Sequence, residues 1–432
     1  MEDYRIRQEL FLNDLPNDSI VLIPTNPISY RSNDTTYPYR ASSYMLYLCG
    51  WDAPEAVFMA YRASGAWITS IFVQPRDTKA EIWEGRRVGV EGASSNWPID
   101  EAHSLSDIDE IITKKIKNHN KIYSIPGSNS LLDKIIHKSA SEVLDPREIL
   151  DNMRVIKSEG EIKLMKKSAS LASFAHIEGM KRTFSGIGEW EIQSIIESHF
   201  SSNKSCTSYN SIVGGGDNAT ILHYNSNDIV VNEGNLVLVD AGCEVHGYAS
   251  DITRTWPVNG KYTIPQKEIY SLVLRAEIAG INACQVGAPW SAMHHAASKV
   301  LAQGLIDLGI LKCSFEEALG ENYDGKFRNF FMHGTGHMLG LDVHDVGGGR
   351  QGDKTPERTL QPGMVLTVEP GLYFGSWRTD IEIPSRYSGI GIRIEDDVLI
   401  TDTGPVVLTS ECPKEISEIE SLVGNGLSEN YA

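Results

Sequence analysis

Short apolar runs alternate with amphipathic segments over the first third of the chain. Buried strands are predicted at four of these runs: SIVLIP (19–24), EAVFMAY (55–61), AWITSIFVQ (66–74) and RRVGVEG (86–92). Apolar residues recur every three to four positions at 106–120 and 130–143, which predicts helices there. The alternation of strands and helices predicts an α/β domain over residues 1–150.

The pattern changes in the second part of the chain, residues 151–432. Helical periodicity extends over 159–181 and 188–200, and a further helical interval spans 265–319. Strands are predicted at NLVLVDAG (235–242), SDITRTWPV (250–258), GMVLTVEPG (363–371) and GIRIEDDVLIT (391–401). This order of helices followed by strands predicts an α+β domain, with the chain as a whole divided near residue 150.

Charge and composition narrow the class of protein. The 39 Lys and Arg residues against 57 Asp and Glu residues give a formal charge of −18, which excludes a basic nucleic-acid-binding surface. The N-terminus is charged throughout, unlike a signal peptide, and the apolar runs are shorter than the ~20 residues of a membrane span. The six cysteines form no CxxC pair. We therefore expect a cytoplasmic protein without a disulfide framework.

Carboxylates fall at the ends of the predicted apolar strands of the second part. If residues 244–247 form a turn, Asp240 pairs directly with Asp251, and the two side chains share one face of a hairpin. Two such acids in an apolar sheet repel each other unless they share a cation or a proton. The alternative is a solvent-facing hairpin in which neither acid has a special role.

The later strands repeat this placement. Glu369 ends an apolar run, and Glu395 lies within another, beside Arg393 on the same strand face. Between the Asp240/Asp251 pair and the Glu369/Glu395 pair, FFMHGTGHMLGLDVHD carries His333, His337 and His344 in twelve positions, without the HExxH pattern of zinc peptidases. Histidine is a common metal ligand and proton-transfer group, so this cluster indicates a site, although each histidine alone could be structural.

These residues together predict a metal centre. The candidate ligands are Asp240, Asp251, His337, Glu369 and Glu395. Four carboxylates would be neutralised by two divalent cations, and an oxygen-rich set with one imidazole suits Mn²⁺, Co²⁺, Zn²⁺ or Fe²⁺. We expect Mn²⁺, with Co²⁺ or Zn²⁺ as alternatives. Two ions about 3.5–4 Å apart can share a water and polarise a carbonyl, which is the chemistry of a two-metal hydrolase.

The sequence resembles the pita-bread metallopeptidase family, which includes methionine aminopeptidases, prolidases and aminopeptidase P. The resemblance is carried by five motifs in one order: SIVGGGDNATILHYN, VLVDAGCEVHGYASDITRTWPVNG, FFMHGTGHMLGLDVHDVG, QPGMVLTVEPGLYF and GIGIRIEDDVLIT. It implies a pita-bread fold for residues 151–432 and the same five metal ligands. It also implies that His223, His333, His344 and Arg393 line the substrate site.

The first domain is similar to that of aminopeptidase P and creatinase. The similarity is carried by RSNDTTYPYRASSYMLYLCGWDAPEAV (31–57) and AEIWEGRRVG (80–89), and it argues against methionine aminopeptidases. It implies a homo-oligomer, a dimer or tetramer, in which Asp34 and Trp83 approach a neighbouring subunit's site. The loop at 346–362 departs from bacterial aminopeptidase P in length and in lacking a tyrosine, which leaves the outer subsites open.

The resemblance implies hydrolysis of the residue that precedes proline at a peptide N-terminus, by a hydroxide bridging two metal ions. Glu369 would act as general base as well as ligand, and His333 and His344 would donate to the carbonyl oxygen. His223 would contact the substrate near proline, and Arg393 would orient Glu369 or bind substrate. The alternatives are an Xaa-Pro dipeptidase and a non-catalytic binding module of the same fold.

Overall fold

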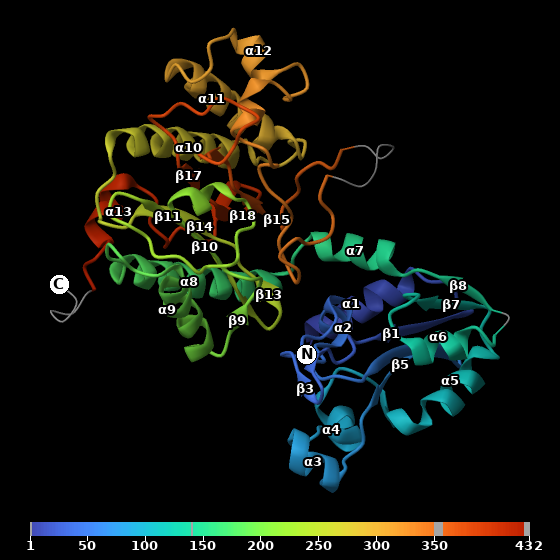
Figure 1. The fold of residues 1–432 in the computed structure, drawn as a ribbon. Helices are drawn as coiled ribbons and strands as arrows, with labels where there is room; N and C mark the ends of the chain where they lie inside the picture. Colours follow the sequence, from blue (N-terminus) through green and yellow to red (C-terminus); the bar gives the residue numbers. More distant parts are fainter. Residues whose placement is uncertain (1, 140, 350–356, 427–432) are drawn as a thin grey trace. The chain divides into compact units, whose positions relative to one another are not determined.

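The computed structural model describes residues 2–139, 141–349 and 357–426, and the chain divides into two compact units. Unit 1 is Met1–Arg154 and unit 2 is Val155–Ala432. The boundary expected at residue 150 falls inside helix α7 (Arg147–Val155). Figure 1 shows the elements of each unit.

Unit 1 contains a six-stranded mixed sheet in the order β6-β5-β4-β1-β7-β8. Its strands are β1 (Ser19–Pro24), β4 (Val57–Ala63), β5 (Ala66–Val73), β6 (Glu101–Ser104), β7 (Lys121–Ser124) and β8 (Glu142–Leu144). A small hairpin joins β2 (Tyr30–Ser32) to β3 (Thr35–Thr36). The helices are α1 (Glu2–Asn13), α2 (Ser43–Cys49), α3 (Thr78–Glu84), α4 (Gly89–Asn96), η1 (Leu105–Asp107), α5 (Ile108–Ile116) and α6 (Ser130–Ile136).

The strand predicted at 86–92 is wrong, since helix α4 begins in the middle of that run. Gly89 has a φ of +71°, which ends any extended conformation, and a Cβ at this position would lie 2.6 Å from the Arg76 side chain. The other three predicted strands and the helix predicted at 106–120 are confirmed. The helix predicted at 130–143 forms only over α6, and its last positions, Glu142 and Val143, belong to strand β8.

Unit 2 combines long helices with several small antiparallel sheets. The helices are α8 (Glu159–Lys181), α9 (Glu189–Ser202), η2 (Gly216–Thr220), α10 (Ile264–Ala283), α11 (Ala292–Asp307), α12 (Phe315–Leu319), η3 (Lys326–Asn329) and α13 (Ile416–Leu422). The strands are β9 (Cys206–Thr207), β10 (Ile212–Gly215), β11 (Leu236–Asp240), β12 (Cys243–Val245), β13 (Tyr248–Ala249), β14 (Thr253–Pro257), β15 (Val365–Val368), β16 (Gly371–Phe374), β17 (Ile390–Arg393), β18 (Asp396–Thr401) and β19 (Gly404–Val407).

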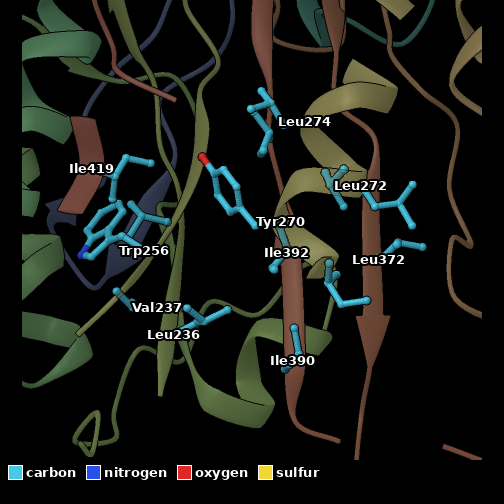
Figure 2. Packing of buried hydrophobic residues seen from close by; sticks show 14 of the residues in the cluster. Leu236, Val237, Trp256, Tyr270, Leu272, Leu274, Leu372, Ile390, Ile392 and Ile419 are labelled. Atoms are coloured by element: carbon cyan, nitrogen blue, oxygen red, sulfur yellow. The ribbon is translucent and has the colours of Figure 1, made fainter. Parts of the chain in front are cut away.

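Helices cover both sides of these strands: α8 and α9 lie on one side and α10 on the other (Figure 1). Strands β10, β11 and β14 form one antiparallel sheet, and β16 pairs with β17 in another. The core around these strands includes Trp256 from β14, Tyr270 from α10 and Ile392 from β17, all buried, with Trp256 beside Ile419 (Figure 2). This apolar packing fixes the strand ends that carry the candidate ligands.

Among the described residues, no helix combines the length and the apolar character that crossing a bilayer requires.

Candidate metal centre

Two of the expected ligands flank a β-hairpin that follows β11. Asp240 is the last residue of β11, and Asp251 stands two residues before β14. The prediction that these residues pair directly is wrong, because the hairpin turns over His246 and Gly247 and not over four residues. Both turn residues have positive φ angles, 51° and 83°, as a tight two-residue turn requires. Asp240 therefore pairs with Thr253.

The corrected register still leaves the two acids together. A change of two residues preserves the face on which side chains lie, whereas a change of one would reverse it. The Tyr209 hydroxyl contacts an Oδ1 oxygen of both Asp240 and Asp251. One hydroxyl shared by two carboxylates holds these oxygens at a common point.

The remaining expected ligands reach this point from later segments. His337 Nε2 lies 3.5 Å from Asp251 Oδ2 and 3.6 Å from Glu369 Oε1. Glu395, between β17 and β18, accepts a hydrogen bond from Thr253 Oγ1 at 2.6 Å. One ligand atom each of Asp251, His337 and Glu395 lies within 4.8 Å of the others. The structure thus brings the predicted side chains into one cluster.

His337 is held in place by strand β15. The Thr367 amide donates to the His337 carbonyl at 2.9 Å, and the His337 amide donates to Thr367 Oγ1 at 3.1 Å. A Cβ at Gly336 would lie 1.9 Å from the Thr367 carbonyl oxygen. Glycine before the second histidine of HGTGH is therefore required for this close approach.

Burial and mutual repulsion dominate the electrostatics of the cluster. Burial raises the pKa of Glu369 to about 7, although His337 and Arg393 oppose the rise. Burial and the neighbouring acids also raise the pKa values of Asp251 and Glu395. For His337, the attraction of Asp251 and Glu369 outweighs burial and raises the pKa to about 9. The carboxylates therefore hold more negative charge than the protein itself compensates.

This donor set fits divalent metal ions. Four carboxylates and one imidazole line the same part of the structure, and the cation beside them, Arg393, pairs with Asp240 at 2.5 Å. Burying such a cluster is costly unless cations neutralise it. Oxygen donors with one imidazole suit first-row divalent ions and not a soft thiolate-binding metal.

Arg393 is engaged on all sides by the protein. Its Nε donates to Thr253 Oγ1 at 3.0 Å, its Nη1 to the Tyr373 hydroxyl at 3.0 Å, and its Nη2 to Asp240. The residue is 3% exposed. Arg393 therefore orients the ligand Asp240 directly.

The cluster opens into a cavity of about 730 Å³. Its lining includes all five expected ligands together with the other residues expected in unit 2, His223, His333, His344 and Arg393. The rings of His337 and His344 contact edge to face, with centroids 4.2 Å apart. The cavity is also lined by residues that sequence reasoning did not single out, among them Tyr209, Trp290 and Met338.

Both ring nitrogens of His333 have protein partners. Nδ1 lies 2.8 Å from the Gly334 carbonyl oxygen, and Nε2 lies 2.8 Å from the Tyr373 hydroxyl. Burial and the nearby Arg393 lower the pKa of His333 to about 3, so the ring is neutral. Because a carbonyl only accepts, Nδ1 carries the proton, and Nε2 accepts from Tyr373.

The two residues expected in the first domain lie in unit 1. Asp34 lies between β2 and β3, Trp83 lies on α3, and both side chains are exposed, Trp83 at 88%. Neither is among the described residues that line the cavity. Part of the divergent loop at 346–362, residues 350–356, lies outside the described residues.

Comparisons with known proteins cover both units. Residues 163–402 match metallopeptidase family M24, and residues 4–123 match the aminopeptidase P N-terminal domain. The Xaa-Pro aminopeptidase of Haemophilus influenzae is 43% identical over 423 residues, covering 96% of each chain. The solved structure of Pseudomonas aeruginosa aminopeptidase PepP has a TM-score of 0.91 at 36% identity, covering 98% of this chain and 97% of that one.

A structure of Escherichia coli aminopeptidase P with the inhibitor Pro-Leu has a TM-score of 0.92 at 37% identity, again covering 98% of this chain and 97% of that one. These similarities confirm the resemblance and the fold class expected from the sequence motifs. The chain therefore belongs to metallopeptidase family M24 and has the two-domain fold of aminopeptidase P.

Proposed function

We propose that this protein removes the N-terminal residue from peptides whose second residue is proline. The observation that carries the proposal is the convergence of four carboxylates and an imidazole in a cavity large enough for a short peptide. The names of its full-length relatives, Xaa-Pro aminopeptidases, support this substrate class. The bond before proline is a tertiary amide with no N–H group, so a dedicated site is needed.

Two divalent ions would be held by Asp240, Asp251, His337, Glu369 and Glu395, with Mn²⁺ as the expected metal and Co²⁺ or Zn²⁺ as alternatives. When bound, such ions lower the pKa of a water molecule and polarise the scissile carbonyl.

Glu369 is the proposed general base. It lines the cavity, and its Oε1 faces His337 at 3.6 Å while its Oε2 faces His333 at 3.7 Å. Its carboxylate would take a proton from the attacking water and later deliver it to the proline nitrogen.

The hydrogen bonds of His333 separate its role from that of His344. Since Nδ1 donates to a backbone carbonyl and Nε2 accepts from Tyr373, neutral His333 has no further N–H to offer a substrate. We therefore assign donation to the developing oxyanion to His344, which also lines the cavity. His333 would hold Tyr373 and Arg393 in place, and His223 would contact the substrate near proline.

For the exposed residues of unit 1, we propose a role between subunits. Asp34 and Trp83 would approach the site of a neighbouring copy in a homo-dimer or homo-tetramer, and the exposure of Trp83 supports this. A cytoplasmic location is also proposed, with short proline-containing peptides as substrates and neither nucleic acid nor membrane as partner.

The bonds of Arg393 argue against the dipeptidase alternative. A dipeptidase needs a cation for the substrate's carboxylate, and Arg393 is the cation beside the ligand cluster that could take this role. Each of its three nitrogens already donates to the protein, at Thr253, Tyr373 and Asp240, so at most two of its five N–H groups remain for a substrate carboxylate. The retained acid cluster likewise disfavours a non-catalytic binding module.

Turnover of three substrates tests the proposal in protein reconstituted with Mn²⁺. We expect cleavage of Xaa-Pro-Xaa tripeptides, weak cleavage of Xaa-Pro, and none of Xaa-Ala-Xaa. Glu369→Gln should lower kcat by at least about 10²-fold, the usual contribution of a general base. The exposed Glu382→Gln serves as the matched control. Wild-type turnover by the Glu369 variant, or preference for dipeptides, would contradict the proposal.

A further inference from the structure

Glu189, the first residue of α9, carries a carboxylate that is completely buried. Its Oε1 accepts from the Gly215 amide at 2.7 Å and from Asn218 Nδ2 at 3.1 Å. Its Oε2 accepts from the Tyr224 hydroxyl at 2.8 Å and from the Ile229 amide at 3.1 Å. Four neutral donors thus satisfy one buried charge, and all four belong to residues 215–229.

The same segment carries His223 to the wall of the cavity. His223 stands between two of the attachment points, Asn218 and Tyr224. After η2, this stretch forms no regular helix or strand, and its own backbone bonds are two turn contacts that involve Ile221, at 3.1 and 3.3 Å. Its conformation therefore depends on tethers from outside, and Glu189 supplies several of them from one carboxylate.

Glycines allow the segment to pack this closely. A Cβ at Gly214 would lie 2.9 Å from the backbone of Asn218 and Ala219, and one at Gly215 would lie 2.6 Å from Val231. Gly216 has a φ of +56°, in the left-handed region. The glycine run of the sequence thus brings the Gly215 amide within reach of Glu189.

We infer that Glu189 is a positioning residue: it fixes the segment that presents His223 and thereby sets the affinity for substrate. The inference rests on the proposed function, in which His223 contacts the peptide near proline. A segment that opens part of the time binds substrate more weakly in proportion to its closed fraction. The ligands Asp251, His337, Glu369 and Glu395 lie outside β10 and the segment that follows it, and Asp240 on β11 is also paired with β14. Loss of Glu189 should therefore raise KM and spare kcat.

The substitution Glu189→Gln keeps the size of the side chain and removes one acceptor. An amide has one carbonyl oxygen, so its NH₂ group must face either Gly215 and Asn218 or Tyr224 and Ile229. At least one backbone N–H then points at another donor. We expect KM for a tripeptide to rise about ten- to a hundredfold, the scale of one lost bond to a charged group, with kcat changed less than about twofold.

A double-mutant cycle with His223→Ala separates positioning from a general structural role. If Glu189 acts through His223, Glu189→Gln raises KM in the wild-type background and has no further effect on KM in the His223→Ala background. The matched control is Glu191→Gln on the same helix, since Glu191 is exposed and caps α9 through the Gly188 amide. Metal content should equal that of the wild type in every variant.

The possible outcomes distinguish a failure of the role proposed for His223 from a failure of the role inferred for Glu189. An unchanged KM in His223→Ala refutes the proposed role of His223, whatever Glu189 does. If His223→Ala raises KM but the effects of the two substitutions on KM are additive, the role inferred for Glu189 is refuted and that of His223 stands. The same holds if Glu189→Gln leaves KM unchanged. If Glu189→Gln does not fold, Tyr224→Phe decides, because it keeps the carboxylate and removes one tether: its KM effect must also vanish in the His223→Ala background.

Discussion

Replacing Arg254 with lysine is expected to destabilise unit 2, although the charge is retained. Arg254 is fully buried on β14, and its guanidinium donates to five acceptors: Asp396 Oδ1 (2.7 Å) and the carbonyls of Thr253 (3.0 Å), Glu395 (2.6 Å), Cys412 (2.9 Å) and Pro413 (3.1 Å). Lysine has three N–H donors, so at least two acceptors lose their partner. Because Lys414 also contacts Asp396 at 2.5 Å, the loss falls on the carbonyls.

Each buried carbonyl left unpaired costs about 1–3 kcal/mol, so the variant should lose at least about 2 kcal/mol. That loss lowers the melting temperature of a domain of this size by about 4–8 °C. Differential scanning calorimetry of the metal-loaded protein measures it, with the exposed Arg275→Lys as control. Since Arg254 also binds the backbone of the proposed ligand Glu395, metal content should fall too. A melting temperature within about 1 °C of the wild type would refute the assigned role of the Arg254 hydrogen bonds.

Three further perturbations address the site and its surroundings. Tyr209→Phe should weaken metal binding by about 10–100-fold, the usual effect of deleting a ligand's hydrogen-bond partner. A metal titration, with activity as the readout, measures the affinity, and an unchanged affinity would contradict this prediction. Lys157→Met removes the cation that lies 3.2 Å from Asp345, and both side chains of this pair are 1% exposed. The variant should lose about 3–5 kcal/mol of unfolding free energy, measured by chemical denaturation. A loss below about 1 kcal/mol would contradict the importance of this buried pair. Burial lowers the pKa of His176 to about 4, below the ~6.5 of an unfolded chain, so the unfolded state takes up the proton first as the pH falls. As the pH falls from about 6.5 to about 4, the wild type should therefore lose stability relative to His176→Gln, and the difference between the two proteins should shrink. A difference that stays constant with pH would contradict this.

Local patterns predicted the elements that local interactions determine. Helix α8 spans Glu159–Lys181 as predicted, because Ser158 and Glu161 form a capping box that fixes its start. The acids at strand ends could also be identified from the sequence, because a carboxylate within an apolar run is costly to bury unless it is paired or bound to a metal ion. The hairpin register could not be predicted in the same way, because the turn at His246 and Gly247 lacks the Asn-Gly or Asp-Gly pair that marks a two-residue hairpin in a sequence.

The missed residues act through contacts distant in sequence. Tyr209 is a lone aromatic in a polar stretch, and only the approach of Asp240 and Asp251 gives its hydroxyl a role. Glu189 looked like an ordinary acid at a helix start, where charge alone is favourable. Its partners lie up to 40 positions away, so no local pattern could identify them.

Because the ligand-bearing segments of unit 2 lie far apart in the sequence, the order of events during biosynthesis is constrained. The bond between Thr253 and Glu395 spans 142 positions, so a nascent chain cannot assemble the centre until β17 has left the ribosome. Until then, Asp240 and Asp251 lack Glu369 and Glu395 beside them, and the full ligand set cannot capture metal. A freshly completed chain must therefore close this long loop against the repulsion of its own carboxylates. Cells starved of divalent metal should accumulate less of this protein, through proteolysis of incompletely folded chains, and not merely an inactive form of it.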